Sequence, residues 1–479
     1  MIVYLLSVAL LLLILEPLFT YYWDSKKLRR FPNASFLSGI SDIGYILKRY
    51  RGFRSKEIHE SHQEHPVVRV GPNTLSFSTP DAIRAIYGHN TPCLKGGTYV
   101  TAAGTHPSLL DVVDKQEHAR KRRILSHAFA TRNLEQWEFK VTDKVQKLVA
   151  QFDLLCHDKE EAIVDFRMWS NLFTIEAIAD IALTVNYIDC LHSGRRATSM
   201  LIWSTKWFLS WRFVLKKLPG FFQTQWHKGQ GFDEMVRYLV QQRLRRHENG
   251  EQLEDFVGCL FQDKHGDARN LEIAEIEAEV ATLLDAGSDT TAISLTHAMY
   301  FLMKTPAALS RLREELHVAL DGSQEVAKYA TVKNLPYLHA CINESLRLLP
   351  PVAFGLNRMT PPEGLTIDGT WIPGNTLVGV PAYTAHRSPL FSNSEQYQPE
   401  RWLEDDIKET QGTFIPFSTG ARGCIGRNIS YIEQTVLLAT LVQRYDLSLV
   451  DPEGNLDHEE AFNLWPGPLS LQIRRRENC

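Results

Sequence analysis

The chain has 479 residues, of which 44% are hydrophobic and 23% charged, a composition typical of a folded globular protein with a large core. Lys and Arg number 52 against 56 Asp and Glu, so the net charge is −4. Because there is also no long basic tract, this balance argues against a protein that binds nucleic acid. No internal repeat, low-complexity block or second domain boundary interrupts the sequence, so we expect one large domain.

The seven cysteines are odd in number, widely scattered and contain no CxxC pair. This pattern indicates a reducing compartment and argues against both a disulfide scaffold and a zinc site. We expect all but one of them to be small buried apolar side chains. They are Cys93, Cys156, Cys190, Cys259, Cys341, Cys424 and Cys479.

The N-terminal segment predicts a membrane anchor. The run from Ile2 to Trp23 is mostly apolar, although Glu16 and Pro17 interrupt it. As a helix at ~1.5 Å per residue it would extend roughly 33 Å, enough to cross a bilayer core. A basic cluster follows without a preceding cleavage site, which favours an uncleaved anchor over a cleaved signal peptide and a body in the cytosol. The basic residues are Lys26, Lys27, Arg29 and Arg30, and the aromatic residues expected at the membrane surface are Tyr21, Tyr22 and Trp23.

We therefore divide the chain into an anchor at 1–23, a basic and polar linker at 24–36 and a folded body at 37–479. In the body, residues 66–78 alternate around a Gly-Pro-Asn turn and predict a β-hairpin, after which Pro80 begins a short helix. From about 117 to 320 the patterns are helical.

The second half of the body combines long helices with short strands. Residues 271–306 contain no proline until the end and predict one helix of more than thirty residues. Residues 335–349 predict another helix, stopped by two prolines, and 427–445 predict a last one. Between them, 365–382 predict short strands with turns at Asp368-Gly369 and Pro373-Gly374. The fold class expected is mainly α with small β-sheets (α+β).

One cysteine has unusual neighbours. In FSTGARGCIG, residues 417–426, Cys424 lies between two glycines and follows an arginine by two positions. Glycines allow tight turns that bring backbone N–H groups toward a sulfur, and the start of a helix favours a thiolate. Phe417 is placed to cover the sulfur and Arg422 to reach a carboxylate of a ligand. The alternative is a buried cysteine in a glycine-rich turn.

This loop resembles the haem-binding loop FxxGxRxCxG of the cytochrome P450 superfamily. The resemblance implies the cytochrome P450 fold, haem b (iron protoporphyrin IX) as cofactor and Cys424 as its thiolate ligand, which promotes O–O cleavage. The chain has no GxGxxG and no room for a flavin domain. Electrons from NADPH are therefore expected from a partner, an NADPH-dependent diflavin reductase, with cytochrome b5 as a second candidate donor, on the cytosolic face of the endoplasmic reticulum membrane.

The long predicted helix carries a second motif, Ala286-Gly-Ser-Asp-Thr-Thr. Small residues let another surface approach the helix backbone, and an acid beside a hydroxyl could supply protons to bound oxygen. The motif resembles the family's [AG]Gx[DE]T[TS], which implies that Thr290 assists dioxygen scission, that Asp289 takes part in proton delivery, and that Ala286 and Gly287 lie against the cofactor. Simple helix packing is the alternative.

Glu344 and Arg347 form an i, i+3 pair on one helical face. Other pairs in the chain have this spacing, and a solvated surface ion pair is the alternative. Its position before PPVAFGLNR and a later Pro-Glu-Arg-Trp resembles the order of the family's ExxR and PERF-like elements. The resemblance implies a buried structural triad of Glu344, Arg347 and Arg401.

Haem propionates need cationic or hydrogen-bonding partners. The family's WxxxR falls on His118 to Arg122, with histidine in place of the common tryptophan. The residues expected to bind propionates are His118, Arg122, Arg358 and Arg422. The residues expected to face solvent, where a basic surface would suit an acidic electron donor, are Arg120, Lys121, Arg123 and Arg427.

The expected substrate is a hydrophobic small molecule, because the positions that contact substrate in this family are mostly apolar and aromatic here. They are Thr282, Val352, Phe354, Leu356 and Phe462, with Thr98, Thr101 and Asn463 as polar residues that could orient the substrate. The run 203–226 is aromatic and either dips into the membrane surface or packs in the core.

VVRVGPNTLSFS and EHARKRRILSHAF are similar to fungal microsomal members, the group of benzoate para-hydroxylases and pisatin demethylases. This suggests hydroxylation or related oxidation of an aromatic or fungal secondary-metabolite scaffold. Two other classes stay open: a haem-thiolate isomerase or dehydratase, which would not need Asp289 or Thr290, and a non-catalytic haem protein that binds a ligand.

Overall fold

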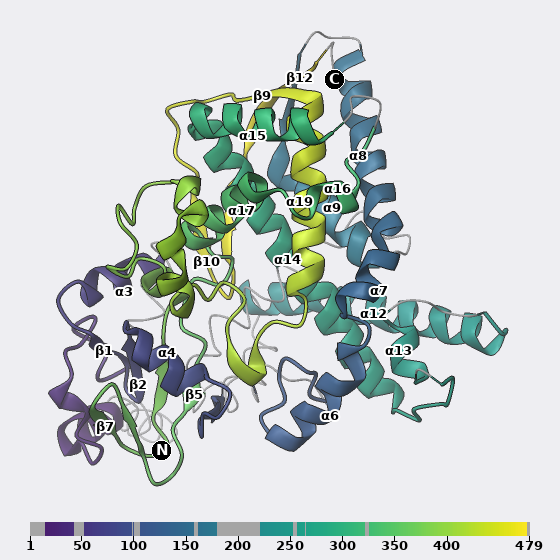
Figure 1. Ribbon diagram of the computed structural model, residues 1–479. Coiled ribbons are helices and arrows are strands. Elements are labelled where there is room, and N and C mark those ends of the chain that lie inside the picture. Colours follow the sequence, from purple (N-terminus) through teal and green to yellow (C-terminus); the bar gives the residue numbers. More distant parts are fainter. Residues whose placement is uncertain are drawn as a thin grey trace.

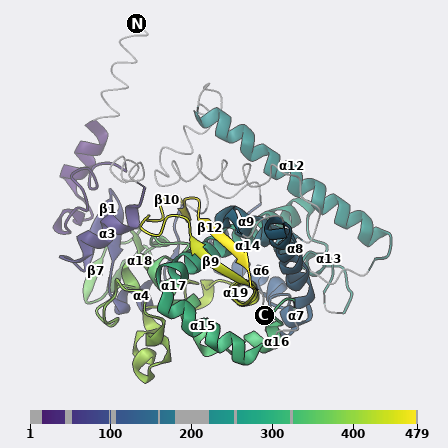
Figure 2. The same cartoon turned by 90° about the horizontal axis from the view of Figure 1, so that it is seen from above.

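The computed structural model describes residues 15–42, 52–97, 99, 106–157, 161–179, 221–251, 256–263, 265–320 and 325–476. Helices make up most of the molecule, and short strands lie both at one side and among the helices, so the fold is mainly α with small sheets, as expected (Figures 1 and 2).

The helices are α3 (Arg54–His62), α4 (Pro80–Tyr87), α6 (Lys115–Ser126), α7 (Thr131–Gln136), α8 (Glu138–His157), α9 (Phe166–Ala179), α12 (Phe221–Glu248), α13 (Gly258–Phe261), α14 (Ile273–Lys304), α15 (Pro306–Ala319), α16 (Tyr329–Val332), α17 (Pro336–Leu348), α18 (Ala382–Ala385) and α19 (Arg427–Arg444). Short 3-10 helices are η1 (Leu28–Arg30), η2 (Pro399–Leu403), η3 (Asp405–Gly412) and η4 (Gly420–Arg422). The strands are β1 (Val67–Gly71), β2 (Thr74–Phe77), β3 (Leu94–Lys95), β4 (Ala162–Asp165), β5 (Arg358–Met359), β6 (Leu365–Ile367), β7 (Thr370–Ile372), β8 (Leu377–Gly379), β9 (Tyr445–Leu449), β10 (His458–Glu460), β11 (Leu464–Pro466) and β12 (Ser470–Arg475).

The largest sheet has five strands in the order β1-β2-β8-β5-β3. Its first two strands form the hairpin predicted from the sequence, with Val67 opposite Phe77. At the other edge β3 and β5 are antiparallel and place Lys95 opposite Arg358. The sheet thus brings together two cationic residues that are far apart in the chain.

Helix α14 is the central helix, and its 32 residues confirm the prediction of one helix of more than thirty. It packs against α9, α12, α17 and α19 (Figure 1). The largest apolar core lies where α14 meets α8, α9, α15, α17 and α19, and it includes Leu295, Leu346 and Leu437. The helices predicted around 335–349 and 427–445 are also confirmed, as α17 and α19.

Strand β4 lies inside the region that we expected to be wholly helical. It pairs with β12, which also pairs with β9, so the three-stranded sheet has the order β4-β12-β9. Its four residues are too few to show a period of their own, and its strand partner lies about three hundred residues later in the chain. The prediction was wrong here because the pairing is set by tertiary structure.

Most of the predicted anchor, residues 1–14, lies outside the described residues, and 15–23 are helical. None of the helices within the described ranges has the length and apolar character needed to cross a membrane. The basic linker contacts the β1–β2 turn, the turn before β8, and β7. Lys26 Nζ donates to Asn73 Oδ1 (2.8 Å) and to the Asn375 carbonyl (2.5 Å), and Arg30 donates to the Trp371 carbonyl.

Candidate functional site

The cysteine loop, residues 417–426, contains η4 and leads into α19. Its shape is set by backbone hydrogen bonds. The Cys424 N–H donates to the Phe417 carbonyl (2.8 Å), and the Gly423 N–H donates to the Gly420 carbonyl (3.1 Å). Gly420 has a φ of +70°, and a Cβ there would overlap the carbonyl oxygen of Tyr87 in α4. Only glycine fits, so the loop is held tightly against α4.

Protein surrounds Cys424, yet its side chain has exposed surface. Burial raises the pKa of the thiol, while N–H groups of Gly426 and Arg427 and the charges of Arg122 and Arg427 act in the opposite direction. A sulfur that accepts backbone N–H groups and stays open on one side fits a thiolate ligand of haem iron.

Phe417, expected to cover the sulfur, packs its ring against Tyr431 of α19 (centroids 5.4 Å apart), and Arg427 lies over it at 5.6 Å. Arg122 of α6 donates to the Gly423 carbonyl (2.7 Å). These contacts fix both ends of the loop, and the Arg122 contact links the loop to α6.

The four predicted propionate ligands lie near one another. Arg422 donates to the carbonyls of Val112 (2.7 Å) and Val113 (2.8 Å). Burial, followed by the charge of Arg422, lowers the pKa of His118 to about 3, so this ring is neutral at pH 7. Burial, followed by the charge of Arg358, lowers the pKa of Arg422 to about 10. The charges of Arg122, Arg358 and Arg422 therefore lie close to the neutral ring of His118.

A fifth member of this cluster, Lys95, was not predicted from the sequence; it is 8% exposed. Burial and then the charges of Arg422 and Arg358 lower its pKa to about 7, and Asp111 offsets this only in part. The signal in the sequence was a lone lysine between apolar and glycine residues, in CLKGG. We call Lys95, His118, Arg122, Arg358 and Arg422 the cation cluster. A site with such an excess of donors and positive charge fits the two carboxylates of haem.

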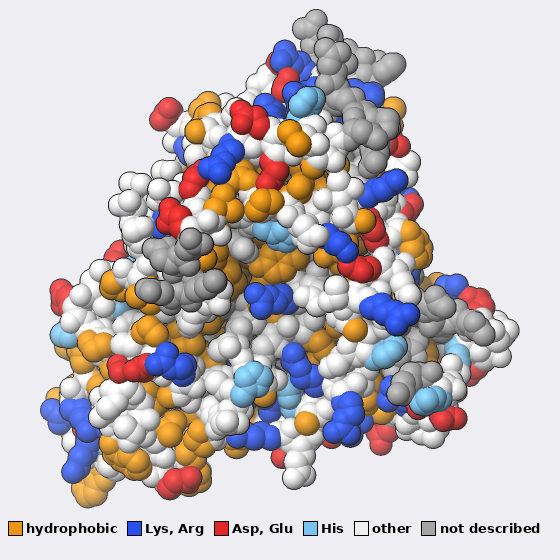
Figure 3. Space-filling model, viewed as in Figure 1, with side chains coloured by type: hydrophobic (Ala, Val, Ile, Leu, Met, Phe, Trp, Pro, Cys, Tyr) orange, Lys and Arg blue, Asp and Glu red, His pale blue; other side chains and the backbone are white. Residues whose placement is uncertain are grey.

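Basic and histidine side chains also gather on the outer face that carries α6 and the loop before α19 (Figure 3). Lys121 is an exception, because the structure contradicts its expected exposure. It is buried and bonds to Glu279 (2.9 Å) and Glu275 (2.6 Å) of α14. The reason is helical periodicity, since Lys121 shares the buried face of α6 with His118 and Leu125.

The acid and hydroxyl of the α14 motif have well-defined partners. Thr290 Oγ1 donates to the Ala286 carbonyl (2.7 Å). Asp289 is 1% exposed, and its Oδ2 accepts from Asn463 Nδ2 (2.5 Å) and Trp465 Nε1 (2.6 Å). The amide of Asn463, which we expected to orient the substrate, is thus bonded to Asp289.

Gly287 faces a neighbouring helix. A Cβ there would lie 2.8 Å from Ile178 Cδ1 of α9. At Gly287 the close approach is therefore made by α9, which is the helix packing given as the alternative, and contact of Ala286 and Gly287 with the cofactor stays a prediction. Ala286 is half-buried, and its carbonyl oxygen accepts the hydrogen bond from Thr290 Oγ1.

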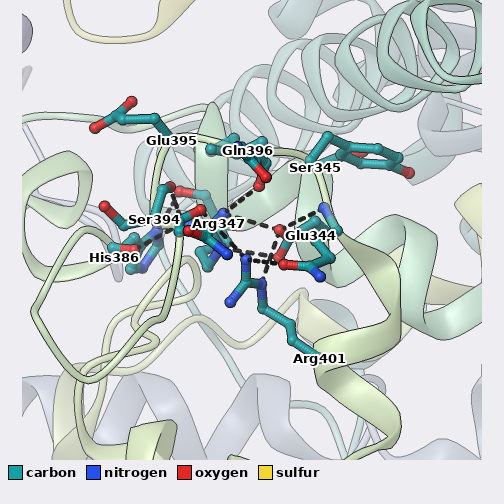
Figure 4. Close-up of polar contacts among 12 residues, drawn as sticks. Glu344, Ser345, Arg347, His386, Ser394, Glu395, Gln396 and Arg401 are labelled. Atoms are coloured by element: carbon teal, nitrogen blue, oxygen red, sulfur yellow. Dashed lines mark hydrogen bonds and ion pairs between the residues drawn. The ribbon is translucent and has the colours of Figure 1, made fainter.

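Glu344, Arg347 and Arg401 meet in the interior (Figure 4). Glu344 is 0% exposed and accepts from Arg347 Nε and Nη2, both at 2.8 Å, and from Arg401 Nε at 3.0 Å. Arg347 also donates to the carbonyls of His386 (3.0 Å) and Ser394 (2.6 Å). The triad thus joins α17 to the segment that leads toward the cysteine loop.

His386 extends this link. Its Nε2 accepts from the Ile415 N–H (2.9 Å), so its Nδ1 carries the proton and donates to the Arg347 carbonyl (3.1 Å). Burial lowers the pKa of His386 to about 3, which keeps the ring neutral. Ile415 lies two residues before Phe417, and the triad therefore reaches the loop through one imidazole.

Two of the predicted substrate residues are in contact. The rings of Phe354 and Phe462 meet edge to face at 5.3 Å. A cavity of about 30 Å³ lies beside Phe354 and is also lined by Asp42 and Asn357. Thr282, Val352 and Leu356 are partly buried. Thr98, Thr101 and the run 203–220 lie outside the described residues.

Comparison with known proteins gives consistent matches along the chain. The chain is similar to benzoate 4-monooxygenase bphA of Aspergillus niger (29% identical, covering 95% of this chain and 94% of the relative). It is 31% identical to tryprostatin B 6-hydroxylase of Aspergillus fumigatus (91% and 79%) and 30% to cytochrome P450 monooxygenase FCK2 of Fusarium pseudograminearum (94% and 82%). The crystal structure of a cytochrome P450 (CYP102L1) has the same fold, with a TM-score of 0.75, 21% identity and coverage of 93% of this chain and 99% of that one.

The family model described as Cytochrome P450 matches residues 37–473. Members of this family hold haem through a cysteine thiolate, and NADPH-derived electrons generally reach them from a partner reductase. The resemblance carried by FSTGARGCIG is confirmed, and the chain belongs to the cytochrome P450 monooxygenases.

Proposed function

We propose that this monooxygenase oxidises an aromatic or fungal secondary-metabolite scaffold, with Cys424 as the haem ligand. The observation that carries the proposal is the Cys424 thiol, open on one side and surrounded by N–H donors. When bound, haem would supply activation of dioxygen for insertion of one oxygen atom. In this chain the cation cluster would hold the haem carboxylates, and Asp289 and Thr290 would deliver protons.

The aromatic substrate class is supported by two independent features. Phe354 and Phe462 present rings that meet edge to face, which favours flat apolar partners. One relative is named for benzoate, an aromatic acid. An aromatic acid or a related hydrophobic scaffold is therefore the first ligand class to test.

The decisive experiment is a carbon monoxide difference spectrum of the reduced protein. The wild type should give the spectrum of a thiolate-ligated haem, and Cys424→Ala should lose it. Cys259→Ala is the matched control, because Cys259 is also a free cysteine and is only partly exposed. A wild type without a Soret band, or a Cys424→Ala variant with an unchanged spectrum, would contradict the proposal.

Substrate class is then tested by ligand-induced spin-shift titration. Benzoate, substituted aromatic acids, polyketides and terpenoids would be titrated into the oxidised protein. We expect the aromatic compounds to give saturable shifts, and Phe354→Ala to weaken them by at least about tenfold, because a buried aromatic contact contributes on the order of 1.5 kcal/mol. Shifts with terpenoids alone would contradict the aromatic class.

We also propose that the protein sits at the endoplasmic reticulum membrane through residues 1–23 and receives electrons from an NADPH-dependent diflavin reductase, with cytochrome b5 as a second candidate donor. Tyr22 and Trp23 are exposed, at 68% and 71%, beside Arg29, which stacks on Tyr21 and Tyr22. The full chain should float with phospholipid vesicles, and a chain that begins at residue 24 should float much less. Equal flotation would remove the anchor from the proposal.

A further inference from the structure

The β10–β11 hairpin contacts α14 at the acid of its motif. Asp289, Asn463 and Trp465 are 1%, 0% and 3% exposed. One carboxylate oxygen, Oδ2, accepts from both Asn463 Nδ2 and Trp465 Nε1. Two neutral donors from one hairpin therefore point at the same buried oxygen of the group that the proposed function uses for proton delivery.

The hairpin itself is firmly placed. The Ala461 N–H donates to the Asn463 carbonyl (3.0 Å), and the Leu464 N–H donates to the Pro351 carbonyl (2.8 Å). Trp465 packs with Ala461 and with Ile293 of α14. Because the backbone around both donors is fixed, the two side chains hold the carboxylate in one position instead of following it.

The two donors differ in whether the same side chain can also accept a hydrogen bond. An indole N–H only donates, so Trp465 favours the ionised form of Asp289. A side-chain amide has both a donor and an acceptor, and Asn463 Oδ1 has no hydrogen-bond partner among the described residues. A half-turn of this amide would break one N–H···O bond and form one O–H···O bond with a protonated Asp289, at the same oxygen.

We propose that Asn463 and Trp465 are positioning residues for Asp289, and that rotation of the Asn463 amide lets Asp289 gain and lose a proton while its Oδ2 stays hydrogen-bonded. The proton arrives on Oδ2 from solvent and leaves toward the reacting site, and Asp289 returns to the carboxylate. A buried carboxyl oxygen without a hydrogen-bond partner is unfavourable, so a partner suited to both protonation states lowers the barrier to each transfer. This inference rests on the proposed function, in which Asp289 delivers protons.

The contact can be tested without activity. Trp465→Phe keeps the ring and removes only the N–H, so it should lower the unfolding midpoint in the wild-type background and much less in an Asp289→Ala background. Trp371→Phe is the matched control, since Trp371 lies in β7 and is 52% exposed. Equal shifts from Trp465→Phe in both backgrounds would overturn the contact.

The positioning role is tested by proton-dependent kinetics. The rate of NADPH oxidation by the holoenzyme with purified diflavin reductase would be measured in H2O and D2O, with benzoate as the probe. NADPH consumption can be measured whether or not benzoate is oxidised. Loss of a positioned proton donor costs ~10²-fold or more, and we expect Asn463→Leu and Trp465→Phe to slow the rate by at least about threefold. Both should enlarge the solvent isotope effect, and Asp289→Asn, which removes the carboxylate itself, should enlarge it as well.

Purely structural damage would not enlarge the isotope effect in a variant whose carbon monoxide difference spectrum keeps its wild-type amplitude. Asn463→Ala is the second variant if Asn463→Leu does not fold. Variants with an intact spectrum, wild-type rates and a wild-type isotope effect would overturn the inference. A wild type that lacks the spectrum would instead show that the proposed function fails.

Discussion

Glu344 shows how one buried carboxylate can hold distant segments together. It accepts from Arg347, Arg401, the Trp402 indole (2.9 Å) and the Gln398 N–H (2.9 Å). A buried ion has a large desolvation cost, which only such complete hydrogen bonding offsets. The spacing of Glu344 and Arg347 was visible in the sequence, but the Trp402 and Gln398 contacts were not, because they depend on how η2 folds back onto α17.

Removal of this carboxylate should be severe. Glu344→Ala leaves two buried guanidinium groups unpaired, and we expect a loss of about 3–5 kcal/mol in the free energy of unfolding. Urea unfolding followed by fluorescence would measure it. The exposed Glu363→Ala is the control and should stay within about 0.5 kcal/mol of the wild type. A similar small change for Glu344→Ala would argue against a structural triad.

Lys95 gives a prediction about pH. Its pKa in the folded protein, about 7, lies below its ordinary value of 10.5. Between these pH values the unfolded chain holds a proton that the folded chain has released, so the haem-free protein should become more stable as pH rises, by up to ~1.4 kcal/mol per pH unit from this group. Below about pH 7 both states are protonated and the dependence ends.

Unfolding of haem-free protein between pH 7 and 10 would measure this slope. Lys95→Met should flatten it, and Lys333→Met, at a lysine outside the cation cluster that pairs with Glu135, should not. The same Lys95→Met variant should release haem faster to an apo-globin acceptor, because one cation facing the carboxylates is lost. An unchanged slope in Lys95→Met would show that Lys95 does not cause this pH dependence.

At the scale of elements, the close contact between the cysteine loop and α4 depends on one glycine. Gly420 and Gly369 share a φ of +70°, but only Gly420 is next to other backbone, whereas the space around Gly369 is open. Substitution at Gly369 therefore reports the cost of the backbone conformation alone. The same change at Gly420 adds the collision with Tyr87.

We expect Gly369→Ala to cost about 1 kcal/mol and Gly420→Ala clearly more, with loss of haem from the purified protein. Gly412→Ala should be close to neutral, since nothing surrounds its added Cβ. Haem content per protein and the unfolding midpoint are the measurements. Equal effects at positions 369 and 420 would mean that the loop moves freely away from α4.

Elements with a strong local signal were predictable. Helix α14 has an uninterrupted helical pattern, and the β1–β2 hairpin has a turn with its own chemistry. Lys121, β4 and the partners of Asp289 were not, because each depends on a residue or strand more than one hundred positions away. The cysteine ligand was predictable since its neighbours are local, whereas Lys95 enters the site only through the β3–β5 pairing.

At the scale of the whole molecule, the C-terminal segment contributes to two separate regions, the three-stranded sheet and the surroundings of Asp289. β12 is the middle strand of its sheet, with Leu471 and Ile473 fully buried in the main core, and the hairpin just before it holds Asp289 (Figure 2). A chain that ends before β12 loses the hydrogen-bonded pairing of both edge strands, β4 and β9, at once. Deletion of residues 470–479 should therefore prevent stable folding, as judged by soluble yield and circular dichroism.

A chain that ends at Arg476 is the matched control, because it keeps every described contact, including the Arg476 N–H to the Arg444 carbonyl (3.0 Å). This shorter deletion should leave yield and haem content unchanged. If the 470–479 deletion also folds normally, the sheet contributes less than its burial suggests.

The central place of β12 also bears on biosynthesis. While residues 470–475 are still inside the ribosome, β4 and β9 have no strand between them, and the apolar surface that Leu471 and Ile473 later cover is exposed to water. This sheet cannot form until β12 has left the ribosome, so the nascent chain passes through a stage in which its apolar surface is available to chaperones.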